Sequence, residues 1–204
     1  QLTEADWKQA ADKFLSQMTD AVIEKAIAMQ PSEIRDISGG TIIATLKDRR
    51  NYIVEDVMEY YRFISETVSV TGSDKKELYN INQADDGSVL VQVYKIDKDG
   101  NQSSKMYERK FEPLVTKEIR LYGMDGEDKF VVNGTTDKIK VRLIGGGGSD
   151  AFENTTSGQR GVMVYDRRDG NNTMTGRFKN KMANDTVVNS FERIYYKYPY
   201  QSVF

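Results

Sequence analysis

One segment of the sequence is written twice, and this repeat constrains the fold more than any other feature. "RLYGMDGEDKFVV" begins at Arg120, and "RLIGGGGSDAFEN" begins at Arg142. Each copy is a strand-like run, a glycine turn, an aspartate and a phenylalanine, and Asp128 and Asp150 lie 22 positions apart. A repeat of this length predicts one coil of a parallel β-helix or a short stack of β-arches.

A third, weaker copy follows in "VMVYDRRDGNNTMTG". Here the step from Ile144 to Tyr165 is 21 positions, and the alignment puts Asn171 in the place of the aspartate. Stacked coils would form two inward ladders, one of Tyr122, Ile144 and Tyr165 and one of Phe130 and Phe152. An antiparallel meander that gives a β-sandwich is the competing interpretation, and the sequence leaves both open.

Helical patterns precede the strands. Apolar residues at three-to-four spacing predict one helix from a Thr3 cap to Pro31 and a second helix after a break at 38–40. Four strand-like runs with Asp-Gly turns then predict an antiparallel meander, at 67–71, 77–82, 88–96 and 105–111.

The expected fold class is therefore α+β. A helical hairpin (1–65) should pack on the antiparallel β meander (66–115), followed by a β-helix-like or sandwich-like stack of strands (116–204). These segments are expected to form separate domains or one single compact unit.

The chain contains no cysteine and no histidine. Disulfides, thiolate nucleophiles, zinc-thiolate sites and the usual general base near neutral pH are therefore excluded. Carboxylate, lysine, tyrosine or hydroxyl chemistry remains, as do oxygen-ligated cations such as calcium. A net charge of −2 argues against a nucleic-acid binder. No apolar run is long enough to cross a bilayer, so no membrane span is expected.

The glycine turns resemble the repeat-in-toxin calcium nonapeptide. "GGGGSDAFE" fits its glycine, aspartate and apolar places, and "GMDGEDKFV" departs from them only at Met124. The resemblance implies calcium as a cofactor, with the candidate ligands Asp125, Gly126, Asp128, Gly147, Gly148 and Asp150. Structural turns without an ion are the alternative, because tight turns also prefer glycine and aspartate and because toxin repeats recur with a shorter period.

Nearly the whole chain, roughly 2–200, resembles a region of large envelope proteins of Bacteroidetes. The resemblance is carried by "DRRNYIVEDVMEYYRFISETVSVTGSDKKELYNI", "KVRLIGGGGSDAFEN" and, most distinctively, "EIRLYGMDGEDKF". In these proteins a calcineurin-like phosphoesterase domain is often followed by such a region and then by a surface-antigen-type outer-membrane β-barrel. The family's glycine-aspartate turns map onto Gly123, Gly126, Asp128, Gly145, Gly148 and Asp150.

The resemblance implies an extracytoplasmic module, periplasmic or associated with the outer membrane, whose partners are the neighbouring phosphoesterase and barrel domains. The phosphoesterase's metal-binding motifs are missing from this sequence, so its activity is not carried over. A first residue other than methionine, Gln1, agrees with a processed product or a piece of a longer protein.

The sequence thus predicts a non-catalytic spacer or accessory binding module, stabilised by calcium if the turns bind it. The alternative is a carboxylate-based carbohydrate-active enzyme of the β-helix type, with Asp125, Asp128, Asp150, Asp166 and Asp169 on one face. A third possibility is a partner-binding domain that uses its strand edges or its aromatic tail. In that tail, "FERIYYKYPYQSVF", a final strand is expected to stop at Pro199, and the residues from Tyr198 onward would form an inter-domain joint.

Overall fold

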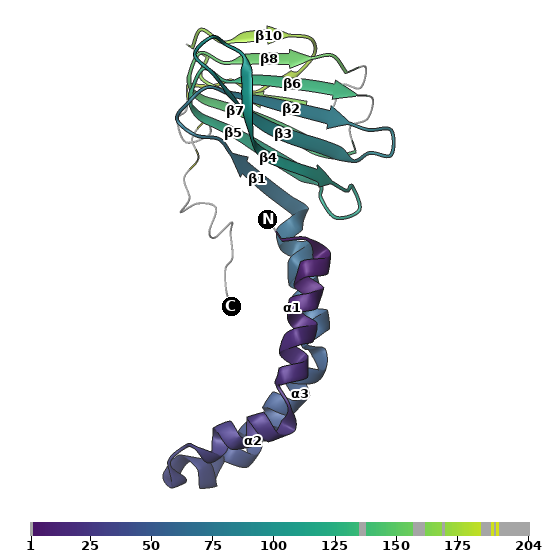
Figure 1. Cartoon of the computed structure of the whole chain (residues 1–204), viewed down its shortest axis with the longest axis vertical. Helices are drawn as coiled ribbons and strands as arrows, with labels where there is room; N and C mark the ends of the chain where they lie inside the picture. Colours follow the sequence, from purple (N-terminus) through teal and green to yellow (C-terminus); the bar gives the residue numbers. More distant parts are fainter. Residues whose placement is uncertain are drawn as a thin grey trace. The chain divides into compact units, whose positions relative to one another are not determined.

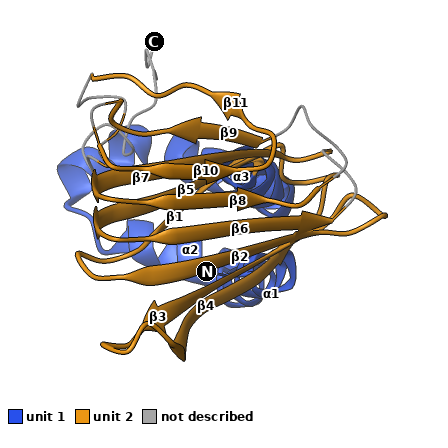
Figure 2. Ribbon diagram, turned by 90° about the horizontal axis from the view of Figure 1, so that it is seen from above, with its two compact units in different colours: residues 1–65 blue, residues 66–204 orange. Residues whose placement is uncertain are grey.

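The computed structural model describes residues 2–134, 138–156, 162–168, 170–184, 189 and 191. The chain divides into two compact units, Gln1–Ser65 and Glu66–Phe204, coloured blue and orange in Figure 2. The described elements are helices in the first unit and strands in the second, so the predicted α+β class is confirmed. The predicted segments 66–115 and 116–204 lie within one unit.

The helical unit contains α1 (Glu4–Gln17), α2 (Asp20–Ala28) and α3 (Ser32–Glu66). The predicted cap of the first helix is confirmed, because Thr3 Oγ1 accepts the N–H of Asp6 and the Asp6 carboxylate accepts the N–H of Thr3. The prediction of one helix up to Pro31 is wrong, since Thr19 starts a new helix by accepting the N–H of Val22. None of the described helices is long and apolar enough to cross a membrane.

The predicted helix break at 38–40 is also wrong, because α3 continues through both glycines. Gly39 is buried, and a Cβ there would lie 3.2 Å from Ile27 Cγ2 in α2. The missing side chain lets the two helices approach closely, which offsets the low helix propensity of glycine, about 1 kcal/mol. This glycine marks a helix contact instead of a helix end.

The second unit is built from strands (Figure 1). They are β1 (Thr67–Thr71), β2 (Glu77–Gln83), β3 (Val89–Ile96), β4 (Gln102–Phe111), β5 (Glu118–Gly126), β6 (Lys129–Gly134), β7 (Lys140–Gly148), β8 (Ala151–Asn154), β9 (Val162–Tyr165), β10 (Thr173–Thr175) and β11 (Lys179–Asn180). One sheet has the order β1-β5-β7-β9-β11, and the other has the order β10-β8-β6-β2-β3-β4.

The strands are arranged as stacked coils. All pairs in the first sheet are parallel, and so are the pairs that join β10, β8, β6 and β2. The coils are therefore β1–β2, β5–β6, β7–β8 and β9–β10, which make a short β-solenoid. The predicted coil is confirmed, and the parallel pairing rules out the antiparallel sandwich.

The predicted antiparallel meander is correct only for β2, β3 and β4. The strand β1 pairs in parallel with β5, and β2 pairs on its other side with β6, so both belong to the first coil. The hairpin β3–β4 is an insertion between two coils. Asp-Gly turns signal the hairpin locally, whereas pairing with strands about 50 positions later leaves no local signal.

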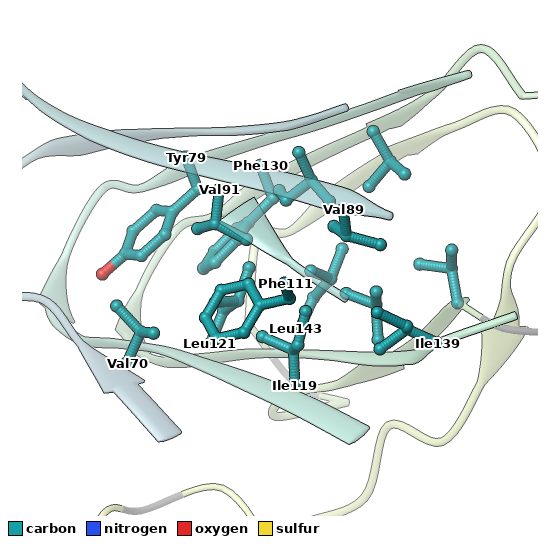
Figure 3. Packing of buried hydrophobic residues seen from close by; sticks show 14 of the residues in the cluster. Val70, Tyr79, Val89, Val91, Phe111, Ile119, Leu121, Phe130, Ile139 and Leu143 are labelled. Carbon is teal, nitrogen blue, oxygen red and sulfur yellow. The ribbon is translucent and has the colours of Figure 1, made fainter. Parts of the chain in front are cut away.

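The core lies between the two sheets, and aromatic rings from successive coils stack within it (Figure 3). Phe130 and Phe152 are stacked with their centroids 5.1 Å apart, which confirms one of the two predicted ladders. Tyr79 extends this ladder into the first coil, since its ring lies 4.5 Å from that of Phe130. Stacked rings in register fix the coil alignment.

The other predicted ladder is aligned but does not point inward. Tyr122 pairs with Ile144, and Ile144 pairs with Tyr165. The core residues on these strands are their neighbours Leu121, Leu143 and Val164, which are fully buried. Side chains alternate between the faces of a strand, so the Tyr122 row lies on the outer face of the first sheet.

Phe191 packs edge-on against Tyr122 on this outer face, with ring centroids 5.1 Å apart. The predicted final strand around Pro199 and the aromatic residues of the tail lie outside the described residues, namely Tyr195, Tyr196, Tyr198, Tyr200 and Phe204.

Candidate functional site

Each coil passes from its first strand to its second through a turn rich in glycine and aspartate. Gly126, Gly146 and Gly148 have φ angles of 132°, 103° and 111°, which glycine adopts at low cost. Met124 is the one non-glycine residue of the described chain with a positive φ, at 80°. Strained backbone of this kind concentrates at functional sites, so these turns are the place to look for one.

Polar side chains inside the turns hold neighbouring coils together. Asp128 Oδ1 accepts the N–H of Glu77 at 2.8 Å, and Asp150 Oδ1 accepts the N–H of Asp128 at 2.8 Å. In the last coil Asn172 Oδ1 accepts the N–H of Asp150 at 2.7 Å. Each coil thus donates a backbone hydrogen to a side chain of the next, and we call this series the inter-coil ladder.

Asp128, Asp150 and Asp166 form an inner aspartate column, and each is only 1% exposed. Glycines leave the space for their carboxyl groups. A Cβ on Gly145 would lie 2.2 Å from Asp166 Oδ2 and 2.3 Å from Asp150 Oδ2, and a Cβ on Gly123 would lie 2.2 Å from Asp128 Oδ2. The glycines of the repeat therefore accommodate buried carboxyl groups as well as turns.

The column is short of hydrogen-bond donors. Within the described part of the chain, the Oδ2 atoms of all three aspartates are buried without a hydrogen-bond partner. Burial raises the pKa of Asp128 to about 9, with smaller contributions from the charges of Asp150 and Glu77. Burial also raises the pKa of Asp150 to about 7, helped by the charge of Asp166. Neutralisation by protons or by a cation would relieve this accumulation of charge.

The six predicted calcium ligands do not come together. Asp128 and Asp150 point into the solenoid, whereas Asp125 is exposed on the outer side of its turn. Gly126, Gly147 and Gly148 are the last residues of β5 and β7, where Asp125 pairs with Gly147 and Gly126 with Gly148. In the described ranges, no group of three acidic side chains is placed to hold a metal ion.

Two members of the turns differ from the prediction: Asn172 was not predicted, and Asp166 was named only for the face of the alternative enzyme. Asn172, and not Asn171, takes the place of the aspartate in the third copy, because Thr173 pairs with Ala151 and the turn after β9 is one residue longer. Asp166 follows Tyr165, which pairs with Ile144, so Asp166 occupies in its coil the position that Gly145 occupies in the preceding coil. From this position its side chain joins the inner aspartate column. A separate alignment of each strand, instead of one fixed step, would have found both.

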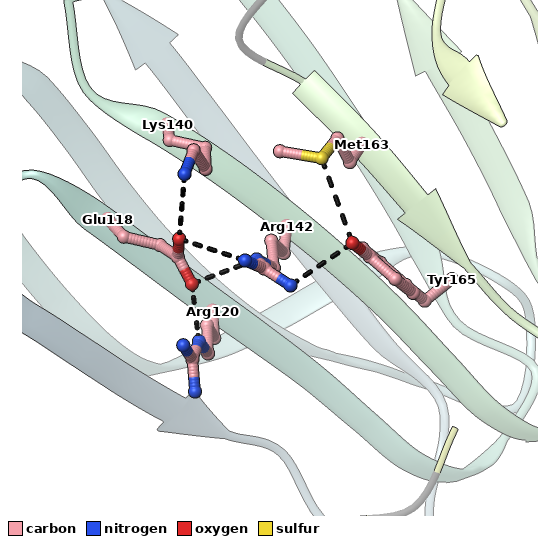
Figure 4. A network of polar contacts seen from close by, with 6 residues as sticks. All are labelled: Glu118, Arg120, Lys140, Arg142, Met163 and Tyr165. Atoms are coloured by element: carbon pink, nitrogen blue, oxygen red, sulfur yellow. Dashed lines mark hydrogen bonds and ion pairs between the residues drawn. The ribbon is translucent and has the colours of Figure 1, made fainter. Parts of the chain in front are cut away.

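A second polar cluster lies on the outer face of the first sheet (Figure 4). Glu118 is 7% exposed and forms ion pairs with Arg120, Arg142 and Lys140. Burial alone would raise the pKa of Glu118, but hydrogen bonds and charges of Arg120 and Arg142 lower it below its ordinary value. Arg142 also donates to the Tyr165 hydroxyl at 3.1 Å. This cluster joins three neighbouring strands, β5, β7 and β9.

A scan against protein-family models matches no family, and searches of curated proteins and of solved structures return no match. The geometry of the turns is therefore what bears on function.

Proposed function

We propose that this chain is a non-catalytic module of a larger envelope protein, in which the β-solenoid serves as a spacer or an accessory binding domain. The observation that carries the proposal is the sealing of the inner aspartate column. Asp128, Asp150 and Asp166 are each 1% exposed, and two of them hold the inter-coil ladder. Carboxyl groups placed in this way stabilise a stack of coils.

The same burial weighs against the carbohydrate-active enzyme. General acid-base catalysis requires a carboxyl group within hydrogen-bonding reach of the substrate. Three of the five candidate aspartates, those of the inner column, face the interior of the solenoid, where a polysaccharide has no access. Asp125 is exposed on the other side of its turn, and Asp169 lies outside the described residues.

The location in the envelope, and the phosphoesterase and barrel domains as neighbours, are proposed from the resemblance of the sequence. The helical unit supports a role within a larger assembly. Its buried hydrophobic residues are few, whereas Met29 is 81% exposed, Ile37 86% and Phe63 55%. A unit of three helices with so small a core gains stability from further contacts. Neighbouring domains of the same polypeptide would provide them.

Two experiments test this proposal. Reading the coding sequence on both sides of Gln1 and Phe204 should reveal a phosphoesterase-like segment before the chain and a barrel segment after it. Finding neither segment would contradict the proposed place of the chain in an envelope protein. Hydrolysis assays of the chain with a panel of polysaccharides should give no turnover. Turnover that Asp125→Asn abolishes would establish the enzyme instead.

Calcium stabilisation is a second proposal, and the buried Oδ2 atoms of the inner column favour it. They are hard oxygen ligands without donors, as calcium prefers. Asp150 and Asp166 belong to successive coils and place their Oδ2 atoms around the same point near Gly145, so an ion there would link the coils. Comparison of the melting temperature with millimolar calcium and with a chelator tests this proposal.

A further inference from the structure

The two edges of the second sheet differ in their chemistry (Figure 1). At one edge, β4 exposes the charged residues Lys105, Glu108 and Lys110. Charged side chains of this kind keep other strands from pairing with a sheet edge. At the opposite edge, β10 has the sequence Thr-Met-Thr, without a charge or a proline. We call it the open edge, since no strand of the described chain pairs with its outer side.

Backbone groups at the open edge point outward without partners. Thr173 donates its N–H to the carbonyl oxygen of Asp150 at 2.8 Å, so the backbone groups of its neighbours Asn172 and Met174 point away from β8. The N–H of Asn172 is the next in the series that forms the inter-coil ladder, and it has no acceptor within the described ranges. The ladder therefore lacks one acceptor at the open edge.

The hydrophobic core is also incomplete at this end. Met174 pairs with Phe152, whose ring stacks on that of Phe130, so Met174 is the last member of the stacked ladder in the core. Met174, Phe178 and Met182 pack against the core but stay half-buried, whereas Phe130 and Phe152 are at most 1% exposed. An aromatic ring over Met174 would extend the ladder and remove apolar surface from water.

The complete coils indicate which strand would fit the open edge. In β8 and its turn, Asp150 precedes Phe152 by two positions, and the same spacing holds one coil earlier. Residues two positions apart in a strand share a face, so both side chains point inward. A strand on the open edge therefore needs an aspartate or asparagine oxygen for the N–H of Asn172 and, two positions later, an aromatic ring for Met174.

The described chain does not supply such a strand to the open edge. The strands β6 and β8 have neighbours on both sides. Asn189 and Phe191 have the required spacing, but Asn189 donates to the carbonyl oxygen of Ala183, and Phe191 packs against Tyr122 on the outer face of the first sheet. A second copy of the chain has these segments in the same places, so the fitting strand comes from a different protein.

We infer that the open edge binds an extended segment of a partner protein in which an aspartate or asparagine precedes an aromatic residue by two positions. The segment adds one parallel strand next to β10. Its Oδ1 atom accepts the N–H of Asn172, its backbone pairs with Met174, and its ring covers the Met174 side chain. Backbone hydrogen bonds provide the affinity and the two side chains the specificity. The inference depends only on the fold of the β unit, so its failure would not contradict the proposed function.

A peptide with the sequence of residues 147–155, GGSDAFENT, has the required spacing and serves as the probe. Titration of the full chain with this peptide should give saturable shifts at Asn172 and Met174 in two-dimensional amide NMR spectra. The peptide variant Asp150→Asn should bind equally well, because an amide oxygen also serves in the ladder. The peptide variants Asp150→Ala and Phe152→Ala should each bind about tenfold more weakly, through loss of the acceptor or of the ring.

Two variants of the protein complete the test. Met174→Ala removes the side chain that the ring covers and should weaken peptide binding about fivefold. The matched control Met106→Ala shortens an exposed methionine of β4 and should leave the affinity unchanged. Amide spectra of both variants, unchanged away from the substitution, show that the β unit is folded.

Other results would overturn the inference. The absence of saturable shifts at millimolar peptide would show that the open edge does not accept a strand. Equal binding of the peptide variant Asp150→Ala would indicate apolar adhesion without the ladder, and shifts along β4 would indicate unspecific pairing with edges. Tighter binding of the peptide to Phe191→Ala than to the unsubstituted protein would show that a segment of the chain itself competes for the open edge.

Discussion

The Oδ1 atom of Asp150 accepts the backbone N–H of Asp128 at 2.8 Å, although the two residues lie 22 positions apart. One coil later, Asn172 accepts the N–H of Asp150 in the same manner. The amide oxygen of an asparagine therefore accepts this hydrogen bond as well as the carboxylate oxygen of an aspartate. The inter-coil ladder requires an Oδ1 acceptor at this position, and it does not require a charge.

Substitutions of Asp150 should separate its acceptor from its charge. Asp150→Ala leaves the buried N–H of Asp128 without a partner, and we expect a loss of about 1–3 kcal/mol in the free energy of unfolding. Asp150→Asn keeps the acceptor and removes a charge from the column, so its stability should remain within about 1 kcal/mol of the unsubstituted protein. Urea unfolding at neutral pH measures both. Equal losses in the two variants would show that the charge, and not the acceptor, matters.

Calcium should raise the melting temperature if it enters the inner aspartate column. Melting curves recorded with millimolar calcium and with a chelator should then differ modestly, because the ion binds the folded state only. Asp150→Asn should abolish the difference, whereas Asp99→Asn, in a distant turn, should preserve it. Identical curves with and without calcium would leave the turns with a structural role alone.

The repeat was readable from the sequence because its signal is local and periodic. Leu121 and Leu143, like Phe130 and Phe152, recur at one step, and pairing in register follows from that step. The first coil was missed because Tyr79 matches Phe130 only across the inserted hairpin, at a different step. Its strands therefore resembled part of the antiparallel meander.

The sequence predicted less well which side chains of a strand face the core. In "EIRLYG" both Leu121 and Tyr122 are apolar enough for a core, and the period of two does not decide between them. The charges decide, because Glu118 and Arg120 share a face with Tyr122. A cavity beside the glycine-aspartate turns was beyond sequence reasoning, since Asp74 and Asn189 line it from positions without any repeat relation.

Replacing a stacked aromatic side chain by alanine should lower the free energy of unfolding much more than the same replacement of an exposed side chain. Phe130 is completely buried between Tyr79 and Phe152, so Phe130→Ala should lower the free energy of unfolding by about 3–5 kcal/mol. Met106 in β4 is 42% exposed, and Met106→Ala should change the free energy of unfolding by no more than about 0.5 kcal/mol. Urea unfolding followed by the β-sheet circular dichroism signal provides the comparison. Similar losses in both variants would contradict the proposed core.

Substitution by alanine should affect the stability of the helical unit differently at the two adjacent glycines of α3, Gly39 and Gly40. A Cβ on Gly40 meets nothing within 4 Å, so Gly40→Ala should stabilise the helical unit by about 1 kcal/mol. A Cβ on Gly39 would press on Ile27 at 3.2 Å and on Arg35 at 3.3 Å, so Gly39→Ala should gain less or become destabilising. Amide hydrogen exchange in α2 and α3 measures the difference. An equal gain from both alanines would refute the close approach of α2 and α3.

The Glu118 cluster should contribute stability at neutral pH that is lost in acid. Burial alone would raise the pKa of the Glu118 carboxyl, but Arg120 and Arg142 outweigh this effect. In the folded protein the pKa therefore lies below the ordinary value of 4.5. A lowered pKa stabilises the folded state above the unfolded-state pKa, and this contribution disappears as the pH falls through the folded-state pKa. Glu118→Gln should therefore be less stable than the unsubstituted protein at pH 7, and the gap should narrow as the pH falls below 4.5.

The control for this experiment is Glu108→Gln. Glu108 pairs with Lys105 on the surface of β4, where both side chains are more than 40% exposed, so solvent screens the pair and the gap at pH 7 should be small. Urea unfolding of the three proteins across the acid range gives the comparison. A gap for Glu118→Gln that stays constant from pH 7 to well below 4.5 would show that the side chain acts through packing, and that its ionised carboxylate contributes nothing to the stability of the sheet.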